Sequence, residues 1–83
     1  MSDKKFSLVV MSPDQILLSQ KNVTKINIRL DDGKLVGIRS GHAPLIANTA
    51  ACQISYTVDG QIIEKAIPAG ILTVRKKSVK ILT

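Results

Sequence analysis

Apolar and polar residues alternate with a period of two along most of this 83-residue chain. Such alternation is typical of β-strands that bury one face and expose the other to water. The clearest run, 52–59, would bury Cys52, Ile54, Tyr56 and Val58. A second run, 23–30, would bury Thr24, Ile26, Ile28 and Leu30. Both segments are therefore predicted as strands of a half-buried sheet.

The same period predicts further strands over residues 5–11, 15–20, 34–38, 61–67, 71–75 and 78–83. In the first of these, Phe6, Leu8 and Val10 share a face, and in the last pair the inward residues would be Leu72, Val74, Val79 and Ile81. Residues 47–51 are small and poorly patterned, so they fit either a short edge strand or a connection.

Turn residues separate these segments at short intervals. Asp31-Asp32-Gly33 predicts a hairpin with glycine in the left-handed position, and Asp59-Gly60 predicts a two-residue type I′ hairpin. Pro68 interrupts pairing because it has no N–H to donate. No segment shows a helical period with caps. We therefore predict an all-β single domain over residues 1–83, a flattened sandwich or barrel of about ten short antiparallel strands.

The composition supports this fold and limits the classes of partner that the chain is expected to bind. Hydrophobic residues make up 45% of the chain but aromatic residues only 2%, so the core is built from Ile, Val and Leu. Twelve Lys and Arg against six acids give a net charge of +6, which fits a nucleic-acid partner, an acidic protein partner or a solvated surface. Nucleic acid is disfavoured because aromatic stacking platforms are nearly absent and no basic helix is visible.

Residues capable of catalysis do not converge in this sequence. The chain has one histidine, His42, and one cysteine, Cys52, which is expected on the apolar face of its strand. A Cys–His pair is formally possible, but one His and one Cys do not make a metal site. No phosphate-binding glycine motif or signal peptide is present, and no apolar run approaches the ~18 residues of a membrane span. We predict no catalytic, cofactor-binding or metal-binding residue, and a binding function.

The stretch from Gly33 to Leu45 holds three of the five glycines and the histidine. Gly37, inside a strand, predicts a bulge or a close backbone approach. Gly41 permits a positive φ, and Pro44 favours extended geometry in the residue before it. Together Gly37, Gly41 and Pro44 predict an ordered structural corner.

Residues 37–45, Gly-Ile-Arg-Ser-Gly-His-Ala-Pro-Leu, resemble the epsilon subunit of F-type ATP synthases. That family carries a Gly-Ile/Val-x-Pro-Gly-His-Ala-Pro-Leu run at this point, with Pro where this chain has Ser40. Residues 8–13, 23–26, 69–74 and 78–82 are also similar to the family's strands, in the same order. The resemblance therefore extends over essentially the whole chain.

This resemblance implies a ten-stranded β-sandwich that acts as a non-catalytic subunit of the central stalk. It implies two partners, the gamma subunit and the ring of c subunits, and a peripheral position on the cytoplasmic face of the bacterial plasma membrane, in ATP synthesis coupled to ion transport. It also places the ring contact in the loop from Gly33 to His42. The residues predicted to make that contact are Lys34, Leu35, Val36, Arg39, Ser40, Gly41 and His42. His42 would either contact the ring or fix its own loop by hydrogen bonding.

Two departures from the family pattern qualify these expectations. Lys34 stands where the family commonly has an acid, and one extra residue, Leu35 or Val36, precedes Gly37. The family usually continues into two C-terminal helices, whereas this sequence stops at Thr83. The chain is therefore either a short form without those helices or part of a longer protein. In both cases we expect no ATP site and no helical brake within these residues.

Overall fold

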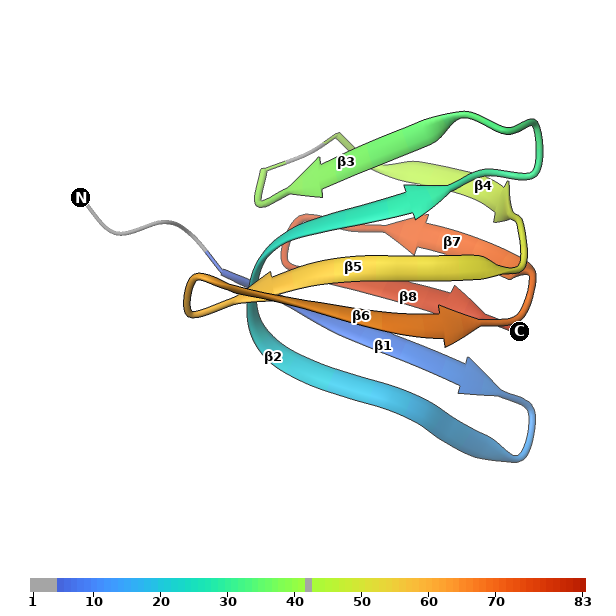
Figure 1. Ribbon diagram of the computed structural model, residues 1–83, viewed down its shortest axis with the longest axis horizontal. Coiled ribbons are helices and arrows are strands. Elements are labelled where there is room, and N and C mark those ends of the chain that lie inside the picture. The colour runs from blue at the N-terminus through green and yellow to red at the C-terminus, as the bar shows by residue number, and fades with distance from the viewer. Residues whose placement is uncertain (1–4, 42) are drawn as a thin grey trace.

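The computed structural model describes residues 5–41 and 43–83, and all the regular structure in this part of the chain is β-strand (Figure 1). The strands are β1 (Phe6–Ser12), β2 (Gln15–Arg29), β3 (Leu35–Arg39), β4 (Leu45–Thr49), β5 (Cys52–Val58), β6 (Gln61–Ile67), β7 (Gly70–Val74) and β8 (Ser78–Leu82). The predicted all-β fold is confirmed, and the described residues contain no helix that could cross a membrane.

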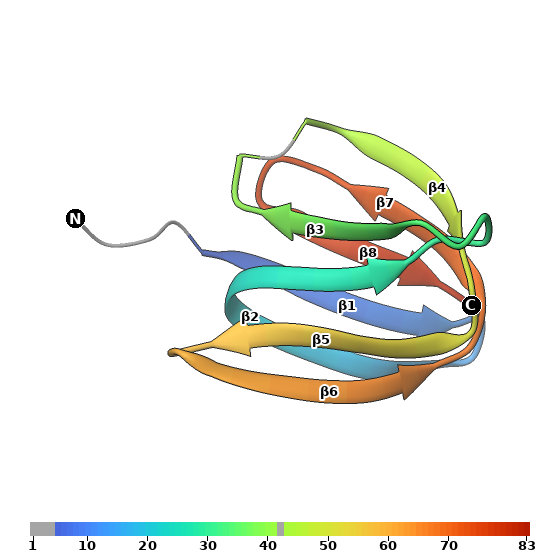
Figure 2. The same cartoon turned by 45° about the horizontal axis from the view of Figure 1, so that its top comes forward.

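The strands form one strongly curled sheet whose two halves face each other as the layers of a sandwich (Figures 1 and 2). One layer contains β3, the second half of β2, β5 and β6. The other contains β4, β7, β8, β1 and the first half of β2. A bridge between Leu30 and Thr49 joins the layers on the side opposite the bend in β2.

The structure has eight strands rather than the ten expected, and strand β2 accounts for one of the two missing. Residues 15–20 and 23–30, predicted as separate strands, form one strand of 15 residues that bends from one layer into the other. The bend contains Asn22, with φ of 62°, and a register shift between Val23 and Lys25. This shift turns Val23 inward beside Ile26, although strict alternation would have placed it on the solvent side.

The pairing of β1 with β8 is parallel, so the expectation of a purely antiparallel sheet is wrong at this position. Residues 7–11 pair with residues 78–82, which brings the two ends of the chain together in the middle of one layer. Such a pair has no connecting turn. The sequence therefore carries no local signal for it.

The core lies between the two layers and is almost entirely aliphatic, as composition predicted. Its buried members are Phe6, Leu8, Val10, Val23, Ile26, Ile28, Ile38, Ile54, Tyr56, Ile67, Leu72, Val74, Val79 and Ile81. The inward faces predicted for the first and last strands are confirmed. The one polar residue buried among the described residues is Thr49.

The predicted turns are present with the expected backbone geometry. Gly33 has a φ of 90°, and Asp59 and Gly60 have φ of 51° and 77°, as a type I′ turn requires. Gly37 forms no bulge, since its pairing with Asn27 is regular. A side chain at Gly37 would instead meet the Oδ1 atom of Asn27 at 3.3 Å, so the close approach is to a neighbouring side chain.

Candidate partner-binding surfaces

The hairpin between β2 and β3 is a rigid projection at one end of the sandwich (Figure 1). The Leu30 N–H donates to the Lys34 carbonyl at 2.8 Å, and the Gly33 N–H donates to the Leu30 carbonyl at 3.0 Å. The Arg29 guanidinium donates to the Gly33 carbonyl at 2.7 Å, and the Lys34 N–H donates to Asp32 Oδ1 at 2.9 Å. Four hydrogen bonds within six residues fix the shape of this tip.

The residues predicted to contact the ring do not form one patch. Lys34 and Leu35 lie at the hairpin, where Leu35 is 64% exposed, and Val36 follows within β3. Arg39 is the last residue of β3, and Ser40 and Gly41 follow it at the other end of the strand. Because five strand residues span about 16 Å, no compact partner touches both groups from one end. The predicted contact of His42 falls outside the described residues.

The structural corner is only partly described. Gly41 has a φ of 83°, so it takes the left-handed conformation that the sequence predicted. Pro44 directly precedes β4, in which Leu45 and Ala47 turn towards the core and Thr49 is buried. The chain therefore changes layers between β3 and β4.

An apolar row crosses the outer face of the layer that contains β7, β8 and β1, and sequence reasoning missed it. Ile71 pairs with Leu82, Leu82 with Met11, and Met11 with Ile16, so these four side chains lie side by side on four adjacent strands. Ile71, Leu82 and Ile16 are 45%, 47% and 64% exposed. We call these four residues the apolar row.

Two further features extend the apolar row. Ile46, on edge strand β4, is 76% exposed on the same outer face. A hollow of about 300 Å³ lined by Met11, Ser12, Pro13, Leu82 and Thr83 lies beside the two middle residues of the row, at the ends of β1 and β8. Exposed apolar surface that is contiguous and hollowed marks an interaction site more often than scattered apolar residues do.

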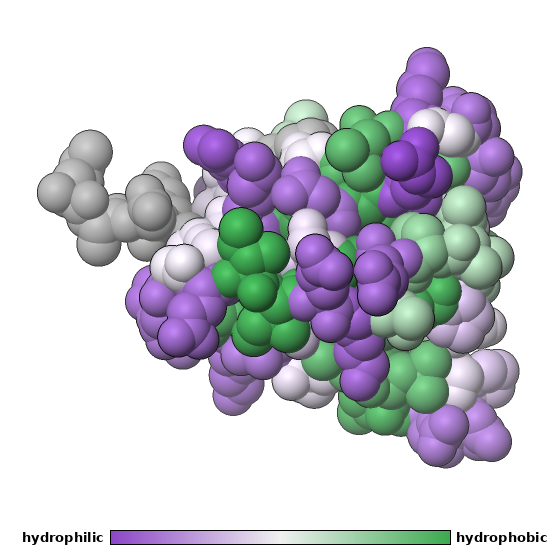
Figure 3. Space-filling view, viewed as in Figure 1, coloured by the Kyte–Doolittle hydropathy of each residue, from purple (hydrophilic) through white to green (hydrophobic). Residues whose placement is uncertain are grey.

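The outer face of the other layer is different in character. In Figure 3 hydrophilic residues are interleaved with separate hydrophobic ones over β3, β2, β5 and β6. Lys25, Asn27 and Arg29 alternate along β2 on this face, and the Asn27 side-chain amide donates to the Ser55 hydroxyl at 3.3 Å. This face is therefore mixed, with the exposed Ile62 and Leu35 among its polar residues.

The described residues bring no catalytic groups together. Cys52 is a half-buried free thiol that packs against the hydrophobic core. No cluster of three or more His, Cys, Asp or Glu side chains occurs in residues 5–41 and 43–83. The candidate functional features of this part of the chain described above lie on the surface of the sandwich.

An aliphatic sandwich with a rigid hairpin tip and one apolar outer face is the class of small β-domain that serves as a docking module. Residues 5–83 match the family model for the β-sandwich domain of the ATP synthase delta/epsilon chain. The chain belongs to this family.

Similar proteins agree with this assignment. The ATP synthase epsilon chain of Natranaerobius thermophilus is 34% identical over 84 aligned residues, which cover 99% of this chain and 58% of the relative. That of Symbiobacterium thermophilum is 26% identical over 76 residues, covering 92% and 54%. The chain thus spans just over half the length of these curated relatives.

Solved structures show the same fold. A chain of the Euglena gracilis mitochondrial ATP synthase, in a structure of its OSCP, F1 and c-ring, has a TM-score of 0.83 at 22% identity, covering all of this chain and 57% of that one. A chain of the Tetrahymena thermophila central stalk and c-ring structure has a TM-score of 0.71 at 10% identity, covering 99% and 65%.

Proposed function

We propose that this chain is a non-catalytic rotor subunit of an F-type ATP synthase, which links the gamma subunit to the ring of c subunits. Its membership of the delta/epsilon family and its resemblance to epsilon subunits support this role. In this role the sandwich is a peripheral part of the complex at the cytoplasmic face of the bacterial plasma membrane. A stiff domain suits the role because torque is transmitted only through contacts that do not deform.

The observation that carries the proposal is the apolar row. A rotor subunit must stay attached to the stalk throughout rotation, and durable contacts between proteins have an apolar centre. Ile71, Leu82, Met11 and Ile16 offer such a centre on the outer face of four hydrogen-bonded strands. We therefore assign the gamma subunit to this face.

The ring contact is assigned to the β2–β3 hairpin, with Lys34 and Leu35 as its residues, while Val36, which packs against the hydrophobic core, is left out. The hairpin projects from the sandwich, is held by four hydrogen bonds and exposes Leu35. Arg39, Ser40 and Gly41, at the far end of β3, are not included in this contact. Lys34 pairs with Asp32 at 4.0 Å on the surface, which leaves both groups available to a partner.

Reconstitution tests this function. The purified chain should form a stable 1:1 complex with the gamma subunit from the same organism, measured by calorimetry, and should join a gamma–ring assembly. Lys34→Cys should form a cross-link to the polar loops of the ring, and Gly41→Cys should not. Failure to bind gamma under conditions where the catalytic head assembles would contradict the rotor role. A cross-link from Gly41→Cys alone would contradict the assignment of the hairpin.

The structure does not support the alternative that this chain is a basic module that binds nucleic acid. Phe6 and Tyr56, the two aromatic residues of the chain, are 5% and 4% exposed, so neither offers a stacking platform.

A further inference from the structure

The charges of this domain are segregated between its two ends. One end contains the start of β1, the bend of β2, the end of β3 and the β5–β6 and β7–β8 turns (Figure 1). Its charged residues in the described part of the chain are Lys5, Lys21, Arg39, Asp59, Arg75, Lys76 and Lys77. The opposite end contains the β1–β2 turn and the β2–β3 hairpin, with Asp14, Arg29, Asp31, Asp32 and Lys34. The basic end is therefore the one opposite the hairpin tip.

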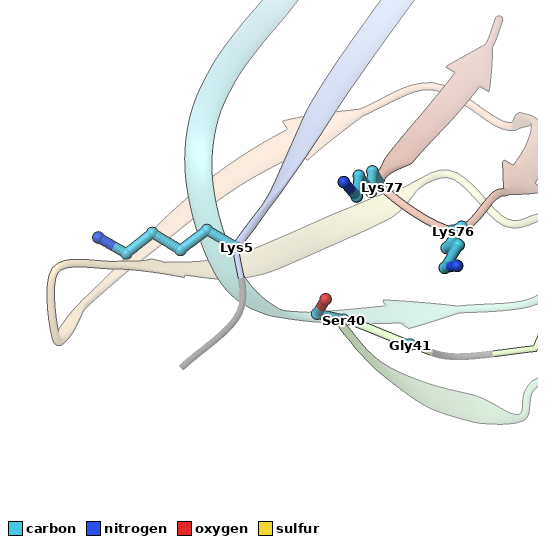
Figure 4. Close-up of a pocket in the computed structure, with 5 residues that line it drawn as sticks. All are labelled: Lys5, Ser40, Gly41, Lys76 and Lys77. Atoms are coloured by element: carbon cyan, nitrogen blue, oxygen red, sulfur yellow. The ribbon is translucent and has the colours of Figure 1, made fainter. Parts of the chain in front are cut away.

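Three of these lysines line a hollow at the basic end, and the Lys5 side chain extends away from Lys76 and Lys77. A cavity of about 520 Å³ is lined by Lys5, Ser40, Gly41, Lys76 and Lys77 (Figure 4). The lysine side chains come from two separate parts of the chain and do not converge on a single point in this view. This spread suits a ligand with several negative charges in a row better than one small anion.

The backbone that carries these lysines is tied together. The Ser7 N–H donates to the Lys77 carbonyl at 3.1 Å, and the Arg75 N–H donates to the Ser78 carbonyl at 2.8 Å. The start of β1 and the β7–β8 turn therefore lie side by side. Lys76 and Lys77 are adjacent in the sequence, and an anionic ligand would relieve the repulsion between their charges.

The cluster is largely without internal partners. Lys5 lies 3.8 Å from Asp59, with both side chains exposed to solvent, so this pair contributes little. Within residues 5–41 and 43–83, Lys76 and Lys77 form no ion pair. The side-chain cations are thus available at the rim of a hollow.

We propose that this lysine-lined hollow binds an acidic segment of a protein partner, a run of Asp and Glu side chains. Lysine provides flexible point charges, which tolerate the varied geometry of successive carboxylates. Both aromatic residues are buried, so bases of a nucleic acid find nothing to stack on. A protein segment is preferred to a small phosphate because the cations are spread around the hollow. This inference does not depend on the gamma or ring contacts, which involve other surfaces.

The test is a titration of the full chain with a ten-residue poly-glutamate peptide, followed by amide chemical shifts. The largest changes are expected at Lys5, Ser40, Gly41, Lys76 and Lys77. Raising NaCl from 50 to 500 mM should weaken binding about tenfold or more, because exposed charges are screened. Lys76→Glu/Lys77→Glu should weaken binding at least about tenfold, since it reverses the local field.

The matched control is Lys25→Glu/Lys80→Glu, which changes net charge by the same amount on the outer faces of β2 and β8. It should change the dissociation constant less than about twofold. Equal effects of the two double variants, with unchanged melting temperatures, would overturn the proposal, since binding would then follow net charge alone. Two further ligands are compared with the peptide: inorganic tripolyphosphate, and phosphatidylcholine vesicles with 30% phosphatidylglycerol. If either binds at these residues more tightly than the poly-glutamate peptide does, the proposal is overturned.

Discussion

The hydroxyl of Thr49 makes two hydrogen bonds to the backbone of a single residue, Gly70. Thr49 Oγ1 donates to the Gly70 carbonyl and accepts from the Gly70 N–H, both at 3.1 Å. Thr49 is 2% exposed, and it pairs with Gly70 at the end of the antiparallel pairing of β4 with β7. This buried contact attaches edge strand β4 to the rest of its layer.

Thr49→Val should therefore destabilise the domain although its shape is nearly unchanged. The substitution removes both hydrogen bonds and leaves the Gly70 N–H and carbonyl without this partner. Such a loss costs about 1–3 kcal/mol in the free energy of unfolding. Urea denaturation measures the change. Thr73→Val, on the outer face of β7, is the control and should change stability by less than about 0.5 kcal/mol. Equal costs at the two positions would contradict a special role for the Thr49 hydroxyl.

Alanine substitution should have different effects at two strand glycines. A Cβ atom at Gly70 would lie 2.9 Å from the carbonyl carbon of Leu82, which is backbone and cannot move aside. A Cβ atom at Gly37 would meet only side-chain atoms, Asn27 Oδ1 at 3.3 Å and Lys25 Cε at 3.8 Å. Gly70→Ala should cost about 3 kcal/mol, as overpacking does, and Gly37→Ala less than about 1 kcal/mol. Thermal and urea unfolding of the two variants measure the loss of stability. A larger loss for Gly37→Ala than for Gly70→Ala would refute this prediction.

Lys65 protects a free sheet edge from self-association. Strand β6 pairs only with β5 in the described part of the chain, and Lys65 pairs there with the buried Ile54, so it lies on the core side of the edge. Inward-facing charges on edge strands disfavour pairing with another molecule. Lys65→Ile should therefore produce dimers or larger species in sedimentation velocity at 100 µM protein. Lys25→Ile removes the same charge from an interior strand and should remain monomeric. If both variants form oligomers, or if neither does, Lys65 does not have this protective role.

Features with local signals were predicted well from the sequence. The Asp59-Gly60 turn, the hairpin at Gly33 and the inward faces of the strands follow from residue types a few positions apart. Alternation failed at Val23, because a bulge near Thr24 changes which face a residue occupies.

Features that depend on long-range pairing could not be predicted. The apolar row joins Ile71, Leu82, Met11 and Ile16, which become neighbours only through the pairing of β1 with β8 and β2. A signal was present, since β1 has apolar residues at Val9 and Met11 on its outer face. The lysine cluster at the hollow likewise joins the two ends of the chain. The residues predicted for the ring contact are close in sequence but lie at both ends of β3, since this strand separates Lys34 from Gly41.

The assignment of the gamma subunit to the apolar row is tested most directly by two charge insertions on opposite faces. Leu82 lies in the apolar row, and Ile62, which is 71% exposed, lies on the outer face of the other layer. Both variants should fold, because both side chains are exposed. Calorimetry with the gamma subunit should show binding weakened at least about tenfold by Leu82→Glu and changed less than about twofold by Ile62→Glu. Weakened binding by Ile62→Glu with normal binding by Leu82→Glu would show that gamma docks on the other layer and would contradict this account.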